Sequence, residues 1–150
     1  MNIYIAGSSQ ELARALAAAE RADSLTKGLS AAGHLEITNR WWDTILKRGD
    51  ANPVDAPFHE RMKYAQEDLQ GVRDADILWL LYPTPGLRSV GCFWEAGYAD
   101  ALGLEVIISG PGQESSIFTT RGCSFSSDEE ALSYLEQQAF FSGECDAVVH

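Results

Sequence analysis

Two carboxylates in the middle of the chain are the side chains best placed to do chemistry. Glu95 falls in the first turns of a helix expected over residues 91–102, and Asp68 lies on an earlier helix expected over residues 58–73. A loop at residues 83–90 leads into the Glu95 helix, so the carboxylate should face the crevice beyond the strand ends of an α/β sheet. Two carboxylates at one crevice suit glycosidic-bond chemistry.

A glutamate in the first turn of a helix most often only compensates the helix dipole. Three aromatic neighbours, Phe93, Trp94 and Tyr98, favour a chemical role for Glu95 because their rings could shield a pocket. Gly97 adds to this, since glycine inside a helix costs about 1 kcal/mol relative to alanine and indicates a close backbone approach.

Two loops are candidates for ligand contacts. Gly7, Ser8 and Ser9 follow the first strand and offer N–H groups and hydroxyls at a helix start, with Ser9 as the expected N-cap. A tight turn with a cap explains the same residues equally well. The phosphate-binding motifs GxGxxG and GxxxxGK[ST] are both absent from the sequence. Residues 39–57 form a turn-rich segment that contains Trp41, and we expect it to cover a site.

Strands and helices alternate along the sequence. Strands are expected at residues 2–6, 35–38, 76–82, 105–109 and 123–125, and helices at residues 11–32, 58–73, 91–102 and 128–140. The uninterrupted apolar runs at 77–81 and 106–108 are typical of strands buried on both faces, so both should be neighbouring central strands. The pattern predicts one doubly wound α/β domain over residues 1–150, flavodoxin- or Rossmann-like, with a four- to five-stranded mainly parallel sheet flanked by helices.

Composition narrows the class of partner. The 150 residues carry 11 basic and 22 acidic side chains, and a net charge of −11 disfavours nucleic-acid polymers and anionic membranes. The longest apolar run is too short to span a bilayer, which predicts a cytoplasmic protein. The three cysteines show no metal or redox spacing, so we expect reduced thiols and no metal. The acidic residues from position 128 onward are expected to form a solvated face.

Three segments together resemble the nucleoside 2-deoxyribosyltransferases: IYIAGSS (residues 3–9), EDLQGVRDADILWLLYP (67–83) and GCFWEAGYADALGLEVI (91–107). The similarity covers roughly residues 1–109, and its strongest element is the order of D-L-x-x-V, A-D and G-x-x-x-E-x-G-Y-A-x-A-L-G. The resemblance implies transfer of a 2-deoxyribosyl group between nucleobases through a covalent intermediate on Glu95. It also implies an assisting carboxylate at Asp68, a substrate contact from Tyr4, no cofactor, and a homo-oligomer in which a neighbouring chain completes each pocket.

One departure leaves the substrate open. Family members that use free nucleosides often carry an aspartate six positions before the glutamate, whereas this chain has Ser89. Serine there resembles the related 2-deoxynucleoside 5'-monophosphate N-glycosidases, which implies hydrolysis to base and deoxyribose 5-phosphate as an alternative. Binding of a nucleotide-derived ligand without turnover is a third reading.

The expected partners are a small nucleoside or nucleotide and a free nucleobase. Substrate contacts are expected from eight residues: Tyr4, Gly7, Ser8, Ser9, Trp41, Ser89, Gly91 and Tyr98.

Overall fold

The computed structural model describes residues 1–28, 34–49 and 53–149. In this part of the chain five strands form one parallel sheet in the order β2-β1-β3-β4-β5. The strands are β1 (Asn2–Ala6), β2 (Glu36–Ile37), β3 (Ile77–Leu81), β4 (Glu105–Ser109) and β5 (Cys123–Phe125). The sheet confirms the predicted α/β class, and β3 beside β4 confirms the two predicted central neighbours.

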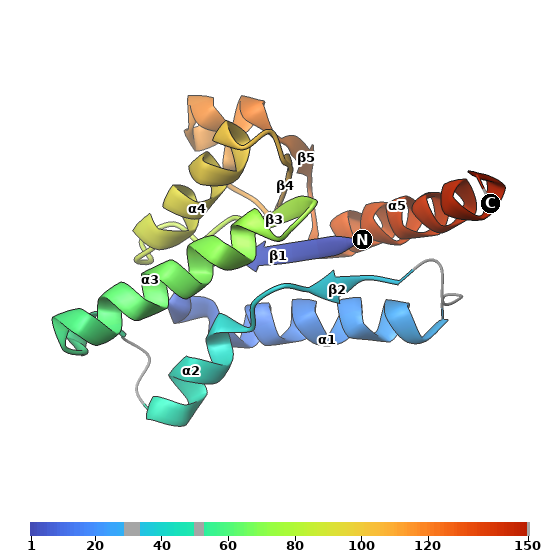
Figure 1. Ribbon diagram of the computed structural model, residues 1–150. Coiled ribbons are helices and arrows are strands. Elements are labelled where there is room, and N and C mark those ends of the chain that lie inside the picture. Colours follow the sequence, from blue (N-terminus) through green and yellow to red (C-terminus); the bar gives the residue numbers. More distant parts are fainter. Residues whose placement is uncertain (29–33, 50–52, 150) are drawn as a thin grey trace.

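Helices cover both faces of the sheet (Figure 1). They are α1 (Leu12–Gly28), α2 (Trp41–Arg48), α3 (Phe58–Arg73), α4 (Val90–Ala101) and α5 (Asp128–Val149), with short 3-10 turns at Ser9–Glu11, Pro53–Asp55, Gln113–Ser115 and Ile117–Arg121. Helices α1, α2 and α5 pack on one face, and α3 and α4 on the other.

Alternation along the central strands explains the two layers. In β3, Trp79 and Leu81 join the core beneath α1 and α5, whereas Leu78 and Leu80 join the core beneath α3 and α4. All five residues of β3 are buried, because successive side chains point to opposite faces and both faces carry helices.

The segment at residues 39–57 differs from the turn-rich loop expected from its sequence, because it contains helix α2. Trp42 and Ile45, three residues apart, are buried on its inner face, and the helix ends at Gly49 with a φ of 71°. Gly49, Pro53 and Pro57 all follow helix α2, so the turn signals belong to the second half of this segment. Residues 50–52 lie outside the described residues.

Helix α3 has the predicted bounds but packs differently from the prediction. Val72 is buried, but Met62 and Ala65, which share its helical face, are exposed. The N-terminal half of α3 extends beyond the carboxyl ends of the strands, so its apolar face has no sheet to cover (Figure 1).

The ends of α1 and α5 show two further differences. Ser8, rather than the expected Ser9, caps the turn before α1, since its Oγ accepts a hydrogen bond from Gln10 N at 3.1 Å. The end of this helix, expected at residue 32, lies outside the described residues. Asp128, expected on a solvated face, is half-buried and bonds both Arg14 and the Ser109 hydroxyl.

None of the described helices is long and apolar enough to cross a membrane.

Candidate active site

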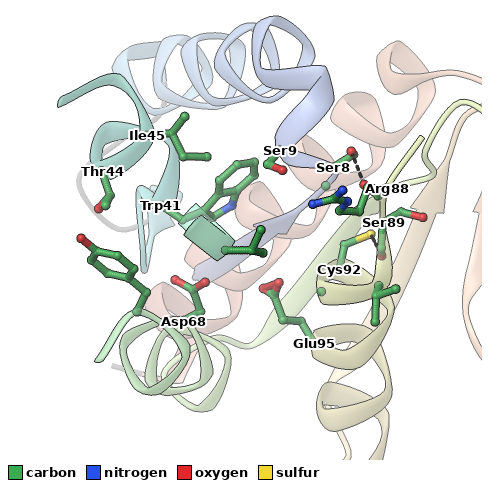
Figure 2. Close-up of a pocket in the computed structure, with 15 residues that line it drawn as sticks. Ser8, Ser9, Trp41, Thr44, Ile45, Asp68, Arg88, Ser89, Cys92 and Glu95 are labelled. Atoms are coloured by element: carbon green, nitrogen blue, oxygen red, sulfur yellow. Dashed lines mark hydrogen bonds between the residues drawn. The ribbon is translucent and has the colours of Figure 1, made fainter. Parts of the chain in front are cut away.

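A cavity of about 420 Å³ opens beyond the carboxyl ends of β1 and β3, within the range of roughly 300–1,000 Å³ usual for ligand sites. It is bordered by the loop after β1, by α2 and α3, and by the loop and first turns of α4 (Figure 2). Fifteen residues line it: Gly7, Ser8, Ser9, Trp41, Thr44, Ile45, Val54, Tyr64, Asp68, Arg88, Ser89, Val90, Gly91, Cys92 and Glu95.

The two predicted carboxylates meet in this cavity. Figure 2 shows Asp68 on α3 and Glu95 on α4 with both carboxyl groups directed into the same space below Trp41. Their helices pack side by side on one face of the sheet, which brings together side chains 27 positions apart in the sequence.

Glu95 lies on the core side of the cavity, next to the buried side chain of Tyr4. Its Oε2 atom is inaccessible to solvent and makes no complete hydrogen bond with a described residue, and the same is true of the Tyr4 hydroxyl beneath it. The Tyr4 hydroxyl nevertheless lies close enough to lower the pKa of Glu95. The two groups thus interact without the geometry of a full hydrogen bond.

Burial dominates the electrostatics of Glu95. Removal of its carboxyl from water raises the pKa to about 8, the Tyr4 contact opposes the rise, and the nearby Asp68 charge adds to it. Helix α4 begins at Val90, so Glu95 is its sixth residue and lies beyond the first turn, where the dipole acts most strongly.

Asp68 is less deeply placed than Glu95. Burial raises its pKa to about 6, and a hydrogen bond from Asn39 Nδ2 to its Oδ1, at 3.1 Å, limits the rise. The contact needs α3 to approach β1 closely, and Gly71 allows this. A Cβ at Gly71 would lie 2.7 Å from the Asn39 Cβ and 3.0 Å from the Tyr4 ring.

One end of the cavity is largely apolar. Trp41, Thr44 and Ile45 of α2 line it together with Val54 and Tyr64. The Trp41 ring is fixed because its Nε1 donates a hydrogen bond to Ile5 O at 2.8 Å. A planar heterocycle can stack against this ring, close to the carboxylates.

The other end of the cavity is rich in donors (Figure 2). Hydroxyls of Ser8, Ser9 and Ser89 gather there beside the side chain of Arg88. No described carboxylate pairs with the Arg88 guanidinium, so its charge is available to an anion. The arrangement fits a phosphate group.

The aromatic residues of α4 are not part of this cavity, which corrects the expectation that they shield it. Tyr98 lies lower on α4, where its hydroxyl accepts a hydrogen bond from Arg73 at 3.0 Å. Trp94 is 71% exposed, and Phe93 packs edge-on against Tyr82 along a separate cavity. Helical rotation turns Phe93 and Trp94 away from Glu95, whereas Tyr98, at i+3, lies about one turn further along α4.

Two further expectations change with the geometry. Tyr4 is fully buried beneath Glu95 and does not line the cavity, so it reaches a ligand only through that carboxylate. No described atom lies within 4 Å of a Cβ placed on Gly97, so the close approach expected there is absent from the described part of this chain.

Several lining residues were not singled out from the sequence. Tyr64 lies one helical turn before Asp68, and this i, i+4 spacing is the signal that could have revealed it. Arg88 stands directly before Ser89, but nothing in the sequence shows that its side chain turns inward. Cys92 is a free thiol that donates to Ser89 O, and burial raises its pKa to about 12.

The fold and this site define a parallel α/β protein with a dicarboxylate crevice. The structure is similar to that of a 2-deoxyribosyltransferase from the psychrotolerant bacterium Bacillus psychrosaccharolyticus, with a TM-score of 0.59 and 19% identity over 88% of this chain and 90% of that chain. It is also similar to a CMP N-glycosidase from Clostridium botulinum, with a TM-score of 0.54 and 15% identity over 92% of this chain and 99% of that one. No protein-family model and no curated protein sequence matches the chain. The resemblance seen in the sequence is therefore confirmed at the level of the fold.

Proposed function

We propose that this protein is an enzyme that cleaves the N-glycosidic bond of a 2-deoxyribonucleoside or its 5'-monophosphate and transfers the deoxyribosyl group to a second nucleobase. The observation that carries the proposal is the pair Asp68 and Glu95, directed into one cavity beneath the ring of Trp41. The similarity of fold to a 2-deoxyribosyltransferase and to a CMP N-glycosidase supports it.

In the first step, a Glu95 carboxylate oxygen attacks C1' of the sugar while the bond from C1' to the base nitrogen breaks. The bonding pair leaves with the base, and a glycosyl ester forms on Glu95. The transition state carries positive charge on the sugar, which the carboxylate stabilises. Absence of a 2'-hydroxyl makes this state easier to reach, so 2-deoxy substrates should react faster.

Asp68 is the residue that donates a proton to the departing base. Its pKa of about 6 lies close to neutral pH, so the carboxyl can both donate and accept a proton. In the second step the incoming base attacks C1' from the face that the first base left. Asp68 takes up the proton of that base, Glu95 is released, and the configuration at C1' is retained.

The two carboxyls must share their protons in a defined way. Between the pKa values of about 6 and about 8 the pair of carboxyls holds one shared proton. Reaction requires this proton on Asp68. The Tyr4 hydroxyl and the positive charge that develops on the sugar in the transition state both favour the Glu95 anion.

Hydrolysis of a 2-deoxynucleoside 5'-monophosphate is the second candidate, and Arg88 is the observation that favours it. Its guanidinium lines the cavity beside Ser8 and Ser89, with no carboxylate partner among the described residues. A free nucleoside has no anionic group to occupy this end. Water in place of the second base would then release deoxyribose 5-phosphate.

Incubation with the four 2-deoxynucleosides and their 5'-monophosphates, with and without a free base, tests the proposal. Base exchange supports the transferase, and base release from monophosphates alone supports the N-glycosidase. Tight binding without either product would contradict both and leave a binding protein. Product chromatography separates these outcomes.

A further inference from the structure

The loop that precedes α4, residues 83–89, is held in place by the segment just before α1. Four hydrogen bonds join the two segments: Ser8 Oγ to Arg88 O at 2.6 Å, Arg88 N to Gln10 Oε1 at 2.6 Å, Thr84 N to Glu11 Oε1 at 2.9 Å and Thr84 Oγ1 to Glu11 Oε2 at 2.8 Å. Gln10 and Glu11 therefore bind opposite ends of the same loop.

The loop has few other supports. Thr84, Pro85 and Gly86 are exposed, and the backbone bond between Leu87 N and Thr84 O is 3.2 Å long. Gly86 has a φ of 91°, a conformation that closes the turn but packs against nothing. Few buried contacts and an exposed backbone are typical of segments that open locally.

Glu11, by contrast, is tied to the core. Its carboxylate lies 3.7 Å from the Arg14 guanidinium, which in turn donates to Tyr82 O at 2.7 Å and to both oxygens of Asp128. This series of contacts runs from α5 through α1 to Thr84 at the beginning of the loop. Helix-dipole compensation alone would not direct both Glu11 oxygens to Thr84.

Neither Gln10 nor Glu11 lines the cavity, but the loop that they hold delivers Arg88 and Ser89 to its donor-rich end. We propose that Gln10 and Glu11 are positioning residues that set the affinity of this end for a phosphate group without touching it. The inference rests on the proposed function for the identity of the natural ligand, and inorganic phosphate tests it independently of turnover.

The direction in which phosphate affinity changes distinguishes a positioning role of Glu11 from a purely electrostatic effect of its charge. Glu11→Ala removes a negative charge near the bound anion, so electrostatics alone would strengthen phosphate binding. Loss of the hold on Thr84 would instead free the loop and weaken binding. Glu11→Gln removes the same charge but keeps an oxygen that accepts from Thr84 N.

Calorimetric titration with inorganic phosphate should show about tenfold weaker binding for Gln10→Ala and for Glu11→Ala, because the first loses one and the second two hydrogen bonds that order the loop. Glu11→Gln should restore most of the affinity. Glu20→Ala, which removes an exposed charge elsewhere on α1, is the matched control and should bind like the wild type. Amide hydrogen exchange at Thr84 and Arg88 should become faster only in the two weakened variants.

Turnover separates this inference from the proposed function. With a 5'-monophosphate substrate, Glu11→Ala should raise KM about tenfold and change kcat much less. Suppose that the wild type binds phosphate, that both variants bind it more weakly, and that no deoxy substrate is turned over. This result would support the positioning role and refute the proposed enzyme activity. Unchanged or tighter phosphate binding in Glu11→Ala, or no binding by the wild type, would overturn the positioning role even if base is released.

Discussion

Glu95 has the most demanding role of any single residue, because burial raises its pKa to about 8 while the proposed reaction uses its anion. Glu95→Gln keeps the shape of the side chain and removes the nucleophile. We expect turnover to fall by several orders of magnitude while substrate binding survives. Mass spectrometry of the wild type with substrate should show a transient deoxyribosyl adduct on Glu95, and a fully active Glu95→Gln variant would refute the mechanism.

The shared proton predicts a pH profile. Below about pH 6 both carboxyls are protonated and the nucleophile is lost, whereas above about pH 8 neither carries a proton for the leaving base. A plot of kcat/KM against pH should therefore be bell-shaped, with its maximum between these values. A rate that stays constant from pH 5 to pH 9 would show that this carboxyl pair does not control the reaction.

Ser89 should determine the preference for a 5'-monophosphate over a free nucleoside. Ser89→Asp places a negative charge beside Arg88, where it repels phosphate and competes for the guanidinium. Monophosphate use should fall at least tenfold more than nucleoside use, as measured by kcat/KM on both substrate forms. Equal losses on the two forms would count against a phosphate site at this end.

At the scale of elements, the contact of α3 with β1 sets the place of Asp68. Gly71→Ala puts a methyl group 2.7 Å from the Asn39 Cβ, so α3 must shift and Asp68 with it. Overpacking of this kind costs about 1–3 kcal/mol, to be measured by urea unfolding, and activity should fall as well.

Gly97→Ala is the matched control for this substitution. It also adds a methyl group to a glycine inside a helix, but no described atom lies within 4 Å. We expect it to stabilise the fold by about 0.5–1 kcal/mol through helix propensity. A Gly71→Ala variant as stable and active as Gly97→Ala would contradict the tight packing of α3.

Sequence patterns predicted the elements whose burial is continuous and missed those whose packing depends on distant residues. The apolar runs of β3 and β4 were sufficient to place both in the centre of a parallel sheet. Helix α2 was missed because Gly49, Pro53 and Pro57, which follow its eight residues, dominate the pattern, although Trp42 and Ile45 carried the helical spacing.

The site was predictable where chemistry and helix spacing coincide, as for Asp68 and Glu95. It was not predictable where the direction of a side chain determines whether a residue lines the cavity, because sequence spacing alone does not show which face of α4 meets the cavity. Tyr98 was expected in the pocket and points elsewhere, and Arg88 was overlooked although it lines the donor-rich end.

At the scale of the whole molecule, the surface beside the cavity indicates self-association. Val90 and Trp94 of α4 are 73% and 71% exposed, and together with Ala65 and Leu69 of α3 they line a shallow cavity that both carboxylates also border. Exposed apolar surface of this kind tends to form interfaces.

We therefore predict a homodimer or a larger assembly, as the family resemblance implied. Light scattering at micromolar concentration should give at least twice the chain mass of 16.4 kDa. Trp94→Glu should reduce it, whereas a stable monomer in the wild type would remove this prediction.

The order of the strands also has a consequence for how the protein folds. Strand β1 lies between β2 and β3, and Ile3 pairs with Ile77, a contact that joins residues 74 positions apart. Pairing over such distances requires closure of long loops before any contact compensates their entropy, so folding is slow compared with that of helical bundles. Tyr4 reaches Glu95 only when β1 is in place. We therefore expect the crevice to form only after β1 has paired with β3.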